Sequence, residues 1–231
     1  ISLFSFTNSY ASHLMGGEIT YTHIAGNDYE VTLIVYGDCD PGSIDVSRNQ
    51  RVHFESISCG LDFDFNIPYI QTLPESPACL TAVSTCNGGT IPGSRKNIFR
   101  GIVSLPPCVD WNIYWTQGTR NPNITNLVAP ATTNLFILNT LNNVVGAFNN
   151  SPQYLTSPNP YMCANQLKIF SHGATDADGD SLYYSLAQPL TTPGPPGNPI
   201  AFMPGYSLLQ PMLTSTGINL DQATGEMCFT P

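Results

Sequence analysis

Apolar and polar side chains alternate along several short stretches of the chain. Residues 18–24 alternate clearly, and residues 29–36 are rich in β-branched side chains, with an Ala-Gly-Asn sequence between them that is typical of a hairpin turn. Residues 51–57 alternate again, which places Val52 and Phe54 or their neighbours on one apolar face. A period of two residues predicts β-strands that each bury one face.

The same signals continue through the middle of the chain. Residues 97–105, 111–115 and 134–139 are further predicted strands, and proline or glycine occupies nearly every gap, which excludes long helices. Residues 131–145 could form a helix, but their threonine and asparagine content favours a strand. The pattern predicts an all-β fold of two consecutive β-sandwich modules of the immunoglobulin-like or cadherin-like kind.

A change in composition divides the chain near residue 150. Residues 12–149 form the first predicted module, stapled by disulfides, and the proline-rich residues 150–160 form a stiff linker. Residues 161–231 form the second module, which stops where its final strand is expected. This indicates either a fragment of a longer protein or an open edge that takes a strand from elsewhere. Residues 1–11 are predicted to be a signal-peptide remnant or, alternatively, an N-terminal strand.

The chain has few charges for its 231 residues. Charged side chains make up 10%, against about a quarter in typical globular proteins, and the net charge is −9. This balance argues against nucleic acid as a partner, because phosphate binding needs clustered Lys and Arg, and it disfavours anionic lipid surfaces. The sequence also lacks a run of about 18 apolar residues, so membrane insertion is not expected. The profile predicts a secreted protein, extracellular or on the cell surface.

Seven cysteines are more than a cytosolic domain of this size usually carries, and none forms a C-x-x-C pair. They favour disulfides formed in an oxidising compartment. The candidates for pairing are Cys39, Cys59, Cys79, Cys86, Cys108 and Cys163. The spacing leaves the connectivity open. Because the count is odd, one thiol stays unpaired or bonds another chain. Cys228 is the candidate, and it could equally be a buried cysteine that packs as a small apolar residue.

Three carboxylates alternate over five positions late in the chain, at Asp176, Asp178 and Asp180. Their charges repel one another unless solvent or a cation neutralises them, and oxygen ligands at alternate positions suit Ca²⁺. Asp221, in a later turn, is a fourth candidate ligand. The alternative is an acidic turn that binds nothing, since Asp and Gly are common turn formers. The spacing does not fit an EF-hand loop.

Several sequence pieces together carry a resemblance to a known family. They lie at residues 12–21, 36–39, 107–115, 120–127, 150–152, 160–166 and 172–180. In this order they resemble the N-terminal region of secreted Bacteroidota surface proteins with a gliding-motility-associated C-terminal domain, followed by a cadherin-like or immunoglobulin-like repeat. The resemblance implies export by the type IX secretion machinery and a role in adhesion, gliding or extracellular assembly without catalysis. The chain lacks two cysteines common in that family, before Arg120 and near Ile169.

The sequence contains no G-x-S-x-G, H-E-x-x-H, P-loop or dinucleotide-binding motif. We therefore predict a non-enzymatic, secreted cell-surface protein for adhesion or structure, with a β module stabilised by Ca²⁺. One alternative is a subunit of an extracellular filament assembled by strand exchange. Another is a carbohydrate-binding module of a secreted hydrolase, using Trp111, Trp115 or exposed tyrosines. The expected partners are surface or matrix proteins, further copies of the chain, and glycans.

Overall fold

The computed structural model describes residues 14–39, 46–75, 83–145, 148–158, 161–191 and 197–231. Within these ranges the chain is built from antiparallel β-sheets and two single-turn 3-10 helices, η1 (Thr85–Asn87) and η2 (Pro130–Thr132). The predicted all-β fold is confirmed. The signal-peptide remnant or N-terminal strand predicted at residues 1–11 lies outside the described residues.

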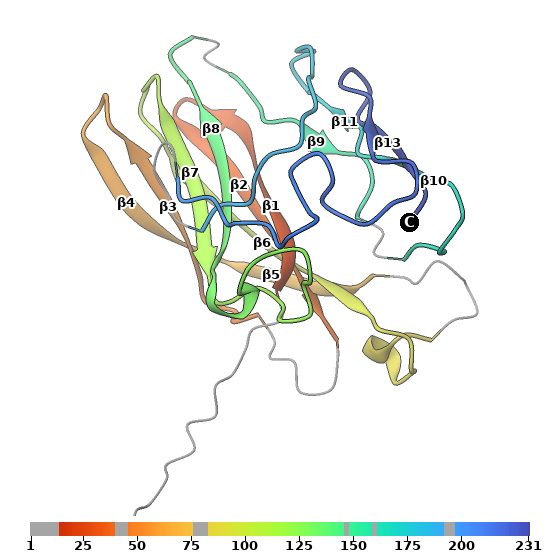
Figure 1. Ribbon diagram of the computed structural model, residues 1–231. Coiled ribbons are helices and arrows are strands. Elements are labelled where there is room, and N and C mark those ends of the chain that lie inside the picture. The colour runs from red at the N-terminus through yellow and green to blue at the C-terminus, as the bar shows by residue number, and fades with distance from the viewer. Residues whose placement is uncertain (1–13, 40–45, 76–82, 146–147, 159–160, 192–196) are drawn as a thin grey trace, which may run out of the picture.

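Two four-stranded sheets form the first half of the molecule (Figure 1). The first sheet contains, in spatial order, β1 (Leu14–Ala25), β2 (Asp28–Asp38), β6 (Ser94–Ser104) and β5 (Tyr69–Pro74). The second contains β4 (Leu61–Ile67), β3 (Gln50–Ser56), β7 (Trp111–Gln117) and β8 (Leu135–Leu141). Every strand expected from the alternating pattern is present in one of these sheets.

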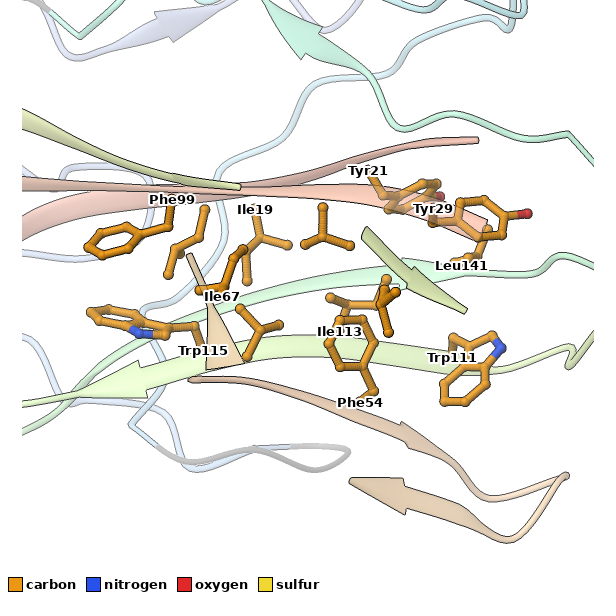
Figure 2. Packing of buried hydrophobic residues seen from close by; sticks show 14 of the residues in the cluster. Ile19, Tyr21, Tyr29, Phe54, Ile67, Phe99, Trp111, Ile113, Trp115 and Leu141 are labelled. Atoms are coloured by element: carbon orange, nitrogen blue, oxygen red, sulfur yellow. The ribbon is translucent and has the colours of Figure 1, made fainter. Parts of the chain in front are cut away.

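The strand period sets which side chains enter the core between the two sheets. In β2, Tyr29 and every second residue to Val35 are buried, whereas the residues between them are only partly buried. The opposite sheet contributes Phe54, Trp111 and Trp115, which are also fully buried. Figure 2 shows these three rings on the second sheet facing Ile19, Tyr29 and Phe99 of the first sheet. Burial of large apolar side chains from both sheets is the main contribution to the stability of the sandwich.

Side-chain hydrogen bonds close one edge of the sandwich, and a proline turns the chain at the other. Along the closed edge, Asn139 of β8 donates from Nδ2 to the Ile19 carbonyl of β1 at 2.9 Å, and the Tyr21 hydroxyl donates to the Thr140 carbonyl at 3.0 Å. At the other edge the chain leaves β4, passes through Pro68 and enters β5 in the opposite sheet. Proline at this corner fits, because it cannot donate to a strand ladder.

Two disulfides tie loops at opposite ends of the sandwich. Cys39 directly follows β2 and bonds Cys86 in η1, at the end where Asp38 pairs with Ser94. Cys59, in the turn between β3 and β4, bonds Cys108. That second bridge lies at the end that holds the β1–β2 hairpin, because Leu105 donates its N–H to the Asn27 carbonyl there. The prediction of a disulfide-stapled first half is confirmed for these two pairs.

In the second half of the chain, the described residues form only short strands (Figure 1). One pair joins β9 (Gln153–Tyr154) to β11 (Ala174–Thr175). A three-stranded sheet places β13 (Glu226–Phe229) between β10 (Lys168–Ser171) and β12 (Asn219–Leu220). The residues predicted as a stiff linker, 150–160, include β9, which pairs with β11.

A late segment returns to the sandwich after the acidic turn. Val128 donates its N–H to the Ala201 carbonyl at 2.9 Å, and Met203 donates to the Asn126 carbonyl at 3.0 Å. Ile200, beside them, is buried. Residues assigned to the two predicted modules therefore pack against each other here, far from the boundary near residue 150.

Candidate functional site

The acidic turn that follows β11 is organised by one of its own carboxylates. Asp176 accepts two backbone N–H donors at Oδ1, from Asp178 at 2.9 Å and from Asp180 at 3.2 Å. Gly179 has a φ of 82°, in the left-handed region that glycine adopts without strain. This is the hydrogen bonding of an Asx-type turn, so the first aspartate and the glycine have a local structural role.

The second carboxylate of the turn reaches across to the start of the predicted linker. Asp178 Oδ2 accepts the backbone N–H of Asn150 at 2.6 Å, and Oδ1 accepts the Asn150 side-chain amide at 2.8 Å. The Asn150 side-chain oxygen in turn accepts the N–H of His23 in β1 at 2.8 Å. A single asparagine thus joins the acidic turn to the sandwich. The sequence gives no signal for this contact, because the partners are 28 residues apart, one at the start of the predicted linker and the other in the second predicted module.

Residues 149–151, the junction segment, lie along β1. The backbone N–H of Ser151 donates to the Tyr21 carbonyl at 3.0 Å, and the N–H of Tyr21 donates to Ser151 Oγ at 2.8 Å. Asn149 donates to the Tyr21 hydroxyl at 3.1 Å. Burial is the main cause that raises the pKa of Tyr21 to about 12, with a smaller contribution from the nearby charges of Asp176 and Asp178. Tyr21 therefore stays neutral and serves as a fixed anchor for the junction segment.

The two remaining predicted ligands behave differently from each other. Asp221 Oδ1 accepts the N–H groups of Ala223 at 2.8 Å and Thr224 at 2.9 Å, which caps the turn between β12 and β13. These hydrogen bonds, Thr224 first, lower the pKa of Asp221. Asp180 is exposed, and its carboxylate makes no hydrogen bond to the part of the chain that the structure describes.

The four aspartates do not converge on one point. Among the described residues, no group of three or more His, Cys, Asp or Glu side chains is placed to hold a metal ion. Ca²⁺ needs six to eight oxygen ligands, and here Asp176, Asp178 and Asp221 direct oxygens at backbone N–H donors. Ca²⁺ binding stays a prediction from the sequence, and the same side chains have a hydrogen-bonding role on their own.

The remaining cysteines divide into two described thiols and one outside the described ranges. Cys163 is exposed and unpaired, so its predicted disulfide is absent from the structure. Cys228 is also unpaired, and burial, with a contribution from the charge of Glu226, raises the pKa of its thiol. Cys79, another predicted partner, lies outside the described residues.

One polar cluster on the outer face of the sandwich was not expected from the sequence analysis. The His53 ring nitrogens lie 3.0 Å from a carboxylate oxygen of Asp62 and 3.0 Å from one of Asp64. The two carboxylates contact opposite sides of the ring, which braces β3 against β4. The alternation of Asp62 and Asp64 with phenylalanines could have revealed this strand and its exposed face.

No protein-family model, curated protein or solved structure matches the chain. Across the described residues, no helix has the length and apolarity needed to cross a membrane. The two disulfides indicate an extracellular or otherwise oxidising environment.

Proposed function

We propose that the protein is an extracellular, non-catalytic module that serves adhesion or the building of a surface structure. The observation that carries this proposal is the position of the two disulfides at opposite ends of one sandwich. Such cross-links restrict the unfolded chain and keep a domain folded outside the cell, where chaperones and reductants are absent. Secretion to the cell surface is part of the proposal, and export through the type IX machinery rests on the sequence resemblance alone.

The hydrogen bonds made by the carboxylates support a role without catalysis. Asp176, Asp178 and Asp221 hold turns or the junction segment. Asp110 accepts hydrogen bonds from the Ser56 hydroxyl at 2.6 Å and from the Ser58 backbone at 2.9 Å, beside the second disulfide. Carboxylates bound to backbone or hydroxyl donors in turns have ordinary structural functions.

The burial of both tryptophans argues against their use in a carbohydrate-binding site. Trp111 and Trp115 are almost fully buried in the core, so neither ring offers a face to a sugar. Trp115 also donates from Nε1 to the Gln50 side-chain oxygen at 2.8 Å, inside the sandwich. The tyrosines that are exposed in the described residues are Tyr154 and Tyr183, so a carbohydrate-binding role is better placed in the second half.

A filament built by strand addition is a second candidate with an observation in its favour. The three-stranded sheet ends on β10 and β12, and in the described part of the chain each pairs only with β13. Open edges of this kind accept strands from other chains. Negative-stain images and size-exclusion chromatography at rising concentration test this: extended polymers support it, and a monodisperse monomer contradicts it.

Two measurements test the main proposal. Intact cells that produce the protein are treated with a membrane-impermeant biotin reagent, with a cytosolic protein of the same cells as the control. Labelling before lysis supports surface location, and labelling only after lysis contradicts it. Beads coated with the oxidised protein are then compared with albumin-coated beads for attachment to those cells. Equal attachment of both kinds of bead contradicts the adhesive role.

A further inference from the structure

The second half of the chain contains a cleft between β9, the segment after the acidic turn, and the hairpin of β12 and β13. Its volume is about 330 Å³, at the lower end of the range of about 300–1,000 Å³ for ligand pockets. Its lining includes three tyrosines, a histidine, a serine and a methionine: Tyr154, Tyr183, Tyr184, His172, Ser185 and Met227. Tyr154 lies far from Tyr183 and Tyr184 in the sequence, so the sequence pattern alone does not place these tyrosines together.

One tyrosine of the cleft is held in a fixed orientation. The Tyr184 hydroxyl accepts the backbone N–H of Ala174 at 2.8 Å, and Ala174 is the residue that pairs with Tyr154 in the β9–β11 ladder. The Tyr184 ring lies over Gly225, where an added Cβ would come within 2.8 Å of two ring carbons. Gly225 also has a φ of 72°, so glycine is required there on both counts.

The histidine of the cleft is equally constrained. Its ring packs edge-to-face against Phe170, with centroids 4.5 Å apart, and against Tyr154, with centroids 6.1 Å apart. Its backbone N–H donates to the Gly225 carbonyl at 2.9 Å. Burial lowers the pKa of His172, so at neutral pH one ring nitrogen donates and the other accepts.

We propose that this cleft binds a neutral glycan, and that it is the ligand site of the adhesive module. Aromatic faces carry negative charge density and attract the polarised C–H groups of a sugar ring, which suits Tyr154 and the 71% exposed Tyr183. The described lining residues include no Asp, Glu, Lys or Arg, although the chain as a whole is acidic. A charged ligand would enter without a counter-charge, whereas a neutral one needs none.

The hydrogen-bonding groups of the cleft favour a sugar over a proline-rich peptide. Tyrosine hydroxyls, serine hydroxyls and a neutral imidazole can each donate and accept hydrogen bonds. Sugar hydroxyls do the same, so the two sets of groups match. A polyproline peptide presents carbonyl acceptors, with no N–H at proline, and would leave the acceptors of the cleft unused. The compact volume also suits one or a few sugar rings better than an extended chain. The proposal rests on the adhesive role and adds a ligand class to it.

The test uses the whole chain and a defined set of probes. Maltotriose, cellotriose, mannotriose, xylotriose and chitotriose are titrated by isothermal calorimetry, with trigalacturonate and decaproline as the acidic and peptide probes. The variant is Tyr183→Ala, with Tyr183→Phe to retain the ring. The matched control is Phe148→Ala, which removes an aromatic side chain that is 67% exposed and lies outside the cleft. Thermal melts check that every variant is folded.

We expect at least one neutral trisaccharide to bind, with affinity reduced about tenfold or more in Tyr183→Ala, reduced less in Tyr183→Phe because the ring is retained, and changed less than about twofold in Phe148→Ala. Binding of decaproline or trigalacturonate without any neutral sugar would overturn the proposal, and so would undiminished sugar binding by Tyr183→Ala. If no sugar binds while coated beads still attach to cells, the glycan proposal fails and the adhesive role stands. If no sugar binds and the coated beads do not attach to cells, the glycan proposal and the adhesive role both fail.

Discussion

The sandwich and the second half of the chain are stabilised in different ways. In the sandwich, strands of up to 12 residues bury Trp, Tyr, Phe and β-branched side chains from two sheets. In the second half, strands have two to four residues, and the described buried apolar side chains after residue 150 are Ile200 and Phe229. Its order comes mainly from turns capped by aspartate and from contacts with the sandwich. From this difference we infer that the second half depends on the first for its stability more than the reverse.

The two tryptophans make this difference measurable. Both lie in the sandwich core, so tryptophan fluorescence reports on the sandwich alone. Far-ultraviolet circular dichroism reports on both halves. If the halves differ as described, urea should change the dichroism before it changes the fluorescence.

The largest effect is expected from the sandwich core. Phe54→Ala removes a fully buried ring between the sheets and should lower the free energy of unfolding by about 3–5 kcal/mol. Leu138→Ala, on the exposed face of β8, is the control and should change it by less than about 0.5 kcal/mol. Urea denaturation followed by tryptophan fluorescence measures both. Similar losses in the two variants would show that this core does not carry the stability of the sandwich.

Removal of the second disulfide should have a comparable, slightly smaller effect. The double variant Cys59→Ser, Cys108→Ser opens a loop with a sequence separation of 49 and should cost about 2–4 kcal/mol. Cys163→Ser alters an unpaired, exposed thiol and serves as the control, with no expected change. Chemical denaturation under non-reducing conditions is the measurement. An unchanged double variant would contradict a stabilising role for this bridge.

A smaller effect, confined to one half, is expected from Phe229→Ala. Phe229 is buried in β13, and Ile200 is the other buried apolar side chain in the described part of the second half, so the loss should be about 2–3 kcal/mol and should fall on the second half. The dichroism transition should move to lower urea while the fluorescence transition stays in place. A parallel shift of both transitions would mean that the two halves unfold as one cooperative unit.

The loss of stability at acid pH offers a further test, of the Asp110 hydrogen bonds in the sandwich. Hydrogen bonds from Ser56, followed by Ser58, lower the pKa of Asp110 in the folded state. This stabilisation is present above the unfolded pKa near 4 and is lost as the pH falls through the folded pKa. Asp110→Asn should therefore lower the Tm at pH 7 and weaken its decline below pH 4. Identical Tm profiles of variant and wild type would exclude this contribution.

Much of the sandwich could be predicted because its signals are local. Alternation in residues 18–24 and 51–57 reports directly which face each strand buries. The strand β4 was missed although Leu61, Phe63 and Phe65 alternate with polar residues, so the signal was present in the sequence. The pairing of the cysteines could not be predicted, because it depends on which loops meet at each end of the finished sandwich.

The second half was less predictable for a physical reason. Its order depends on single polar contacts between distant residues, such as Asp178 with Asn150, and these leave no periodic pattern. The acidic run indicated a turn and a cation site equally well, because aspartate carboxylates accept backbone N–H groups in turns and also supply oxygen ligands to a cation. The position of Asn150 in the folded chain shows that the Asp178 carboxylate accepts two hydrogen bonds from this residue.

We infer that the contact between the acidic turn and the junction segment holds the second half to the sandwich. A matched pair of variants tests this contact directly. Asp178→Ala and Asp180→Ala remove the same charge from one turn, but only Asp178 bonds Asn150. Thermal melts in chelator and in millimolar Ca²⁺ should show Asp178→Ala destabilised by about 1 kcal/mol, or about 2–4 °C, in both conditions, with Asp180→Ala close to wild type. A Ca²⁺-dependent rise in the wild-type Tm that both variants lose equally would contradict the account and support a metal site.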